Sequence, residues 1–199
     1  MHITIAFVSL TIATAGCGSP KMGNDSGKEP AGTAMPSKGE LVQPGQAVPN
    51  IRMLDENGDR FDFDVYKGKA TIVTFFGPGC PAPSVIDRRF ETLQQALVQK
   101  NQWPNVRLVS VSLGPSSAPP ILKEHAQKIG ADRRVWDFVT GDEIEIRQWA
   151  SRFGVPLPSA INDCLEGDLR TAIIDRRGNL VRTYTGTQWT PAQLLDEVR

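Results

Sequence analysis

Cysteine is the residue type best suited to chemistry in this chain, and it occurs three times, at positions 17, 80 and 164. Cys80 lies in Gly77-Pro78-Gly79-Cys80-Pro81, a loop between a β-branched run and a helical pattern. A sulfur at a helix start meets free N–H groups and the positive end of the helix dipole, which favour the reactive, metal-binding thiolate. We therefore expect a functional role for Cys80, with a buried structural thiol as the alternative.

The elements that must position Cys80 alternate between strand and helix. Residues 71–76 and 106–112 are predicted strands, and Ile86, Phe90, Leu93 and Leu97 have the spacing of a helix after the Cys80 loop. Further helices are expected over 120–129, over 143–153 and from Thr190-Pro191 onward. Two hairpins are predicted, 51–54 with 60–63 and 170–175 with 179–184. A hairpin, then βαβα, then a hairpin and a helix predict an α/β, thioredoxin-like fold, in which helices flank a central mixed sheet.

The N-terminal part of the chain predicts export and anchoring. Residues 3–13 form an apolar stretch too short to span a bilayer, and Ala15-Gly16-Cys17 resembles the end of a bacterial lipobox. We expect residues 1–17 to be a signal peptide and Cys17 to be lipidated, so that a cell-envelope lipoprotein faces the periplasm or another extracytoplasmic space. Residues 18–48 lack a periodic apolar face and are predicted to be a flexible tether, with the folded domain over 49–199.

The charge balance excludes one large class of function. The chain carries 22 Lys and Arg against 22 Asp and Glu. A protein that binds nucleic acid through phosphates needs a basic stripe. We expect no nucleic-acid partner.

From about Val48 onward the chain resembles the SCO/SenC family of thioredoxin-like copper chaperones. The likeness rests on the order and spacing of short motifs, which are Gly45-x-x-Val48-Pro49, Asn57-Gly58, Tyr66-Lys67-Gly68-Lys69, Cys80-Pro81, Thr140-Gly141-Asp142, Arg152-Phe153-Gly154-Val155, Asp175-Arg176-Arg177-Gly178 and Trp189-Thr190-Pro191. The resemblance implies copper as cofactor and, as partner, the cytochrome c oxidase subunit with the binuclear copper site.

The family's three metal ligands transfer poorly to this chain. Members carry Cys-x-x-x-Cys-Pro in the first loop and a His before the second hairpin, a set suited to copper. Cys80 matches the first cysteine, but Ser84 stands at the second and Gly167 at the histidine. Ser84 has a structural role available as the helix N-cap, with Asp87 three residues later in a capping box. His125 is predicted to be a solvated helix residue distant from the Cys80 loop.

Cys164 is the one available substitute for the missing ligands. It lies three residues before Gly167, in a loop that the family brings up to the copper loop. In an oxidising compartment, Cys80 and Cys164 are candidates for a redox-active or structural disulfide. A two-thiolate Cu(I) site is the second option, and two independent cysteines are the third.

Three classes of function remain open at this stage. The first is a copper or redox accessory of oxidase assembly, and the second is a thiol-disulfide oxidoreductase or peroxidase. The Cys-x-x-Cys of thioredoxins would need a cysteine at Pro83, and peroxiredoxin patterns would need other residues at Gly77 and Val73. The third class is a binding module that keeps the fold without metal or redox chemistry.

Overall fold

The computed structural model describes residues 39–76, 83–114, 118–156 and 168–198, apart from the side chains of 83 and 84. Cys17, Cys80, Cys164 and Gly167 lie outside these residues, so their predicted roles are not tested by the structure. The described elements, in chain order, are β1 (Arg52–Asp55), β2 (Arg60–Asp62), the 3-10 helix η1 (Phe63–Tyr66), β3 (Ala70–Phe76), α1 (Pro83–Gln99), β4 (Val106–Ser112), α2 (Pro119–Lys128), β5 (Trp136–Thr140), α3 (Glu143–Ser151), β6 (Arg170–Ile174), β7 (Leu180–Thr185) and α4 (Pro191–Glu197).

Within the described residues, one mixed sheet of seven strands organises the fold, in the order β2-β1-β5-β4-β3-β6-β7. Strands β3, β4 and β5 are parallel, whereas β6 runs antiparallel to β3. Every residue of β3 is buried. A central strand covered on both faces explains why its sequence is a continuous β-branched and aromatic run without alternation.

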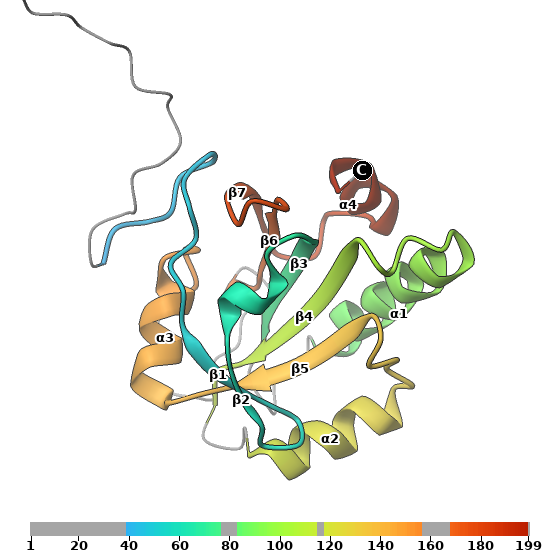
Figure 1. Cartoon of the computed structure of the whole chain (residues 1–199), viewed down its shortest axis with the longest axis horizontal. Coiled ribbons are helices and arrows are strands. Elements are labelled where there is room, and N and C mark those ends of the chain that lie inside the picture. Colours follow the sequence, from blue (N-terminus) through green and yellow to red (C-terminus); the bar gives the residue numbers. More distant parts are fainter. Residues whose placement is uncertain (1–38, 77–82, 115–117, 157–167, 199) are drawn as a thin grey trace, which may run out of the picture.

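The sheet separates two hydrophobic cores (Figure 1). On one face, α1, α2 and α4 pack against side chains such as Ile72 and Phe138. On the other face, α3 and η1 pack against Val73 and Phe75. Successive side chains of a strand point to opposite faces, so β3 contributes to both cores.

Residues 40–48, which the sequence predicted to be tether, pack onto the domain. Val42 and Val48 are each 5% exposed and belong to the core beneath α3. The Gly45 N–H donates to the carbonyl of Leu180, and the Val48 N–H donates to that of Gly178. Two buried valines and these hydrogen bonds supply what the sequence pattern concealed, because no periodicity spans so few apolar residues.

The elements match the predicted ones closely, with one omission. Strand β5 was not predicted, although it pairs with β4 on one side and β1 on the other. Its sequence, Trp136-Asp137-Phe138-Val139-Thr140, lies between two helices and contains an acidic residue. Asp137 is accommodated because its carboxylate is paired, as described next.

A polar network attaches the N-terminal hairpin and η1 to the sheet. Arg107 of β4 donates from Nη2 to Asp137 Oδ1 at 2.6 Å, and Tyr66 donates its hydroxyl proton to Asp137 Oδ2 at 2.9 Å. Arg133 forms an ion pair with Glu56, whose side chain is 3% exposed. Burial, followed by the adjacent Asp137 carboxylate, raises the pKa of the Tyr66 phenol well above its usual value. The network therefore stabilises the fold with the phenol protonated.

We predict that Asp137→Ala lowers the free energy of unfolding by about 3 kcal/mol, because it leaves the half-buried Arg107 charge without its partner. Tyr66→Phe should cost about 1 kcal/mol, the value of one hydrogen bond. Urea denaturation followed by tryptophan fluorescence measures both. Arg134→Ala, which removes an exposed pair with Asp132, is the control and should change little. Equal losses from Asp137→Ala and Arg134→Ala would contradict the role of the network.

Alkaline pH should weaken the fold through Tyr66. A phenol whose pKa is raised by folding stabilises the native state fully below the unfolded pKa near 10. That contribution is lost as pH rises from there through the folded pKa. The midpoint of urea unfolding should therefore fall between about pH 10 and pH 11, and it should fall less steeply in Tyr66→Phe. An identical pH dependence in both proteins would show that Tyr66 is not the cause.

Candidate functional site

The carboxyl ends of β3, β4 and β5 meet at one edge of the sheet, at Phe76, Ser112 and Thr140. We call this the carboxyl edge. Because the three strands are parallel, the chain that follows each of them starts from this edge, and α1, α2 and α3 all begin after it. In sheets of this type the carboxyl end is where ligands bind.

Both segments that carry the candidate cysteines are attached to the carboxyl edge. Cys80 follows Phe76 by four residues. Strand β6 is antiparallel to β3, so that Thr171 pairs with Thr74 and the start of β6 lies beside the end of β3. Cys164 precedes Arg170 by six residues. The topology thus anchors the Cys80 and Cys164 segments on neighbouring strands at the same edge.

Helix α1 begins one residue earlier than the predicted cap. It starts at Pro83, so Ser84 lies inside its first turn, and the prediction of Ser84 as N-cap is wrong. Proline is favoured in the first turn of a helix because it has no N–H to leave unpaired. Asp87, expected to complete a capping box, instead forms an ion pair across to α2.

His125 is the partner of Asp87, and its position differs from the predicted one. Its Nε2 lies 3.2 Å from Asp87 Oδ2, and the two side chains are 30% and 14% exposed. The contact is an ion pair when the ring is protonated, although its angles do not meet those of a hydrogen bond. A half-buried imidazole on an acidic partner is not the solvated residue that the sequence predicted.

The ring of His125 also contacts the end of the central strand. It stacks on Phe76 at a centroid distance of 6.0 Å and an interplanar angle of 24°. It meets Phe138 of β5 edge to face at 5.5 Å. Phe76 is the last described residue before the Cys80 segment, so the prediction that His125 is distant from that segment is wrong. The sequence hides this because 49 residues separate the two.

A groove lies beside the carboxyl edge, between the ends of β4 and β5 and the starts of α2 and α3. Leu54, Ser112, Pro119 and Ile146 are among its lining residues. The groove is open to solvent and mainly apolar in its lining, and it contains no cysteine or histidine among the described residues. It is a concave surface next to the proposed chemistry rather than a chemical centre.

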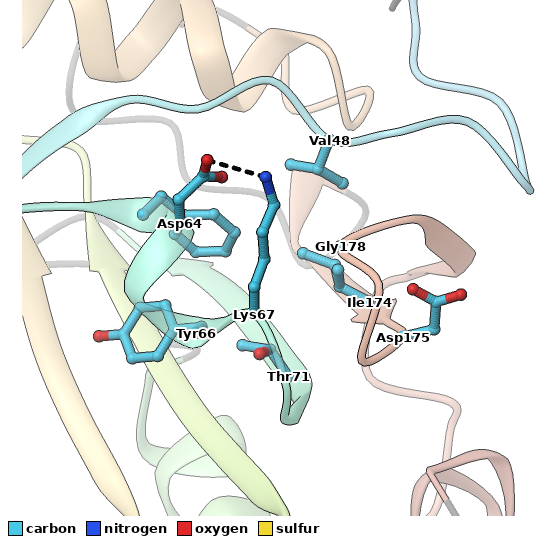
Figure 2. Close-up of a pocket in the computed structure, with 9 residues that line it drawn as sticks. Val48, Asp64, Tyr66, Lys67, Thr71, Ile174, Asp175 and Gly178 are labelled. Carbon is cyan, nitrogen blue, oxygen red and sulfur yellow. Dashed lines mark hydrogen bonds and ion pairs between the residues drawn. The ribbon is translucent and has the colours of Figure 1, made fainter. Parts of the chain in front are cut away.

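A second, narrower pocket lies at the opposite edge of the sheet. Figure 2 shows Lys67 extending between Val48 and Asp64, with Gly178 on the far side. Lys67 Nζ lies 2.8 Å from Asp64 Oδ2. Gly178 has φ +86°, and a Cβ there would lie 3.1 Å from Lys67 Cε, so both backbone conformation and space favour glycine. This pocket is a packing feature of the N-terminal segment and holds no predicted site residue.

Two searches for other features gave negative results over the described ranges. Residues 39–76, 83–114, 118–156 and 168–198 contain no group of three His, Cys, Asp or Glu side chains placed to hold a metal ion. Among the helices formed by these residues, none combines the length and apolar character needed to cross a bilayer.

Comparison by sequence finds no matching family model and no matching curated protein. Comparison by structure finds clear relatives. BsSco, described as a Sco-family cytochrome c oxidase assembly protein with a disulfide switch, superposes with a TM-score of 0.67 and 21% identity, over 80% of this chain and 95% of that one. A SCO1/SenC family lipoprotein from Bacillus anthracis gives 0.66 and 20%, over 76% and 92%. The fold is that of the Sco/SenC proteins.

Two further structures extend the comparison of the Sco/SenC fold. Arabidopsis thaliana ScoI, solved with copper bound, matches with a TM-score of 0.59 and 18% identity, over 76% of this chain and 95% of that one. The thioredoxin domain of a thiol-disulfide oxidoreductase from Bacteroides vulgatus gives 0.58 and 16%, over 79% and 99%. The predicted thioredoxin-like fold class is therefore confirmed.

Proposed function

We propose that this chain is a Sco/SenC-type accessory protein that handles copper or thiol–disulfide chemistry at the carboxyl edge, in assembly of the copper site of cytochrome c oxidase. The observation that carries the proposal is the attachment of both cysteine segments to β3 and β6 at one edge. Structures with this fold include one with bound copper and one with a disulfide switch, which supports either chemistry.

The proposed cellular setting follows from the N-terminal sequence. Export, lipidation at Cys17 and a position in the cell envelope are proposed on the lipobox-like Ala15-Gly16-Cys17. A Bacillus anthracis protein of the same fold is a lipoprotein, which supports the proposal.

The donor set suits copper only in part. Thiolates are soft ligands that bind Cu(I), and imidazole extends a site to Cu(II). This chain offers Cys80 and Cys164 as thiolates, but Ser84 and Gly167 stand where the family pattern has a cysteine and a histidine. We propose that Cys80 and Cys164 together replace the family's cysteine pair, either as a Cu(I) site or as a disulfide.

Copper binding is expected to depend on Cys80. The protein should bind Cu(I) with sub-micromolar affinity in competition with a chromogenic chelator, and Cys80→Ala should abolish binding because it removes the thiolate at the helix start. Ser84→Cys, which restores the family spacing, should strengthen binding. Val98→Ala, at an exposed position on the same helix, is the matched control. Absence of Cu(I) binding by the reduced protein would count against the copper half of the proposal.

The redox half predicts a disulfide between Cys80 and Cys164. Its formation joins the two sulfur atoms and passes two electrons and two protons to a second disulfide, which becomes two thiols. In a Cys17→Ser chain isolated without reductant, thiol titration in denaturant should find no free thiol, and reduction should expose two. Two free thiols before reduction would rule the disulfide out, because bridging requires Cα atoms within about 7 Å of each other.

The oxidoreductase alternative is distinguished by turnover. A thiol-disulfide oxidoreductase would reduce an exogenous disulfide catalytically, whereas a copper accessory would react once. The Bacteroides vulgatus thioredoxin domain has the same fold, which is the observation that favours testing this alternative.

A further inference from the structure

We propose that His125, oriented by Asp87, is the imidazole ligand of the copper bound by this protein. This inference rests on the proposed copper function and assigns a role to a residue that the family pattern does not. It would place the imidazole on α2 instead of at position 167, which is glycine here.

The first support is the supply of imidazole. The chain contains two histidines, His2 and His125. His2 lies in the predicted signal peptide, outside the described residues. Any imidazole chemistry of the folded domain therefore has to come from His125.

The second support is position. His125 stacks on Phe76, where β3 ends, and its acidic partner Asp87 lies on α1, which begins at Pro83. The covalent chain limits how far Cys80 can be from these elements. Four residues reach at most about 14 Å from Phe76, and three reach at most about 11 Å from Pro83. The imidazole is thus held by the two elements that bracket the Cys80 segment.

The third support is the arrangement of the ring. Its Nε2 is buried and faces Asp87 Oδ2 at 3.2 Å. A carboxylate beside one ring nitrogen favours a proton there and leaves the other nitrogen, Nδ1, with the lone pair that binds metal. Histidine ligands of metals commonly have such a carboxylate partner, which fixes the tautomer and the ring orientation. Asp87 would act as this positioning residue, while Phe76 and Phe138 limit rotation of the ring.

Pulsed electron paramagnetic resonance tests the proposal directly. A His2→Gln chain loaded with one equivalent of Cu(II) should show the modulation of a remote imidazole nitrogen, which then can only arise from His125. The modulation should disappear in a chain that also carries His125→Phe, a change that keeps an aromatic ring between Phe76 and Phe138. His125→Asn provides a second variant if the phenylalanine ring does not fit. Thermal unfolding confirms that each variant is folded.

The matched controls separate ligand from scaffold. Glu124→Gln, at an exposed position on the same helix, should leave the modulation unchanged. Asp87→Asn should keep it but weaken copper affinity by about 10-fold or more, as expected for the loss of a partner that orients a ligand. Unchanged affinity in Asp87→Asn would overturn the role of Asp87.

The outcomes distinguish this inference from the function on which it rests. Copper bound by the His2→Gln chain without imidazole modulation would overturn the inference and leave the proposed copper function standing. Unchanged copper affinity in His125→Phe would do the same. No copper binding by any of these chains would overturn both. Loss of binding in Cys80→Ala as well as in His125→Phe would support both.

Discussion

Strand β3 hydrogen-bonds in parallel to β4 and antiparallel to β6, and all seven of its side chains are buried. This pairing determines where the chemistry can be. The parallel partner sends the next helix to the same edge at which β3 ends, and the antiparallel partner makes the chain return to that edge before β6 begins. Two loops far apart in the sequence are thereby attached side by side, whatever residues they contain.

The N-terminal hairpin depends on β3 indirectly, through the network around Asp137. Strand β1 pairs with β5 at two residue positions, Leu54 with Thr140 and Asp55 with Val139. So short a ladder stabilises little by itself. The ion pair of Asp137 with Arg107, and the phenol of Tyr66 bonded to the same carboxylate, connect β4, β5 and η1. The hairpin is thus attached through charged side chains as much as through backbone hydrogen bonds.

Most of the fold could be predicted because its signals are local. The buried run of β3, the helical spacing of Phe90 and Leu93, and the threonine and proline that open α4 each specify an element without tertiary information. Strand β5 escaped prediction because Asp137 interrupts its apolar run, and a buried carboxylate makes sense only once Arg107 is beside it. Val42 escaped because its burial depends on α3.

The candidate site was predictable to a smaller extent. The placement of Cys80 before a helix followed from pattern alone, whereas the contact of His125 with Phe76 depends on how α2 packs on the sheet. Ser84 was placed one residue too early relative to the helix, since Pro83 already begins it. Contacts between elements that are distant in sequence leave no periodic signal, so a histidine beside the site resembles any other helix residue.

The packed segment of residues 40–48 also sets the direction in which the domain is held. Its hydrogen bonds reach Arg152 at the end of α3 and Gly178 in the turn before β7, both on the side opposite to the carboxyl edge (Figure 1). A bilayer attached through the preceding residues would therefore lie behind the domain. The edge that bears the cysteine segments would face outward into the aqueous compartment, open to a partner that approaches from that side.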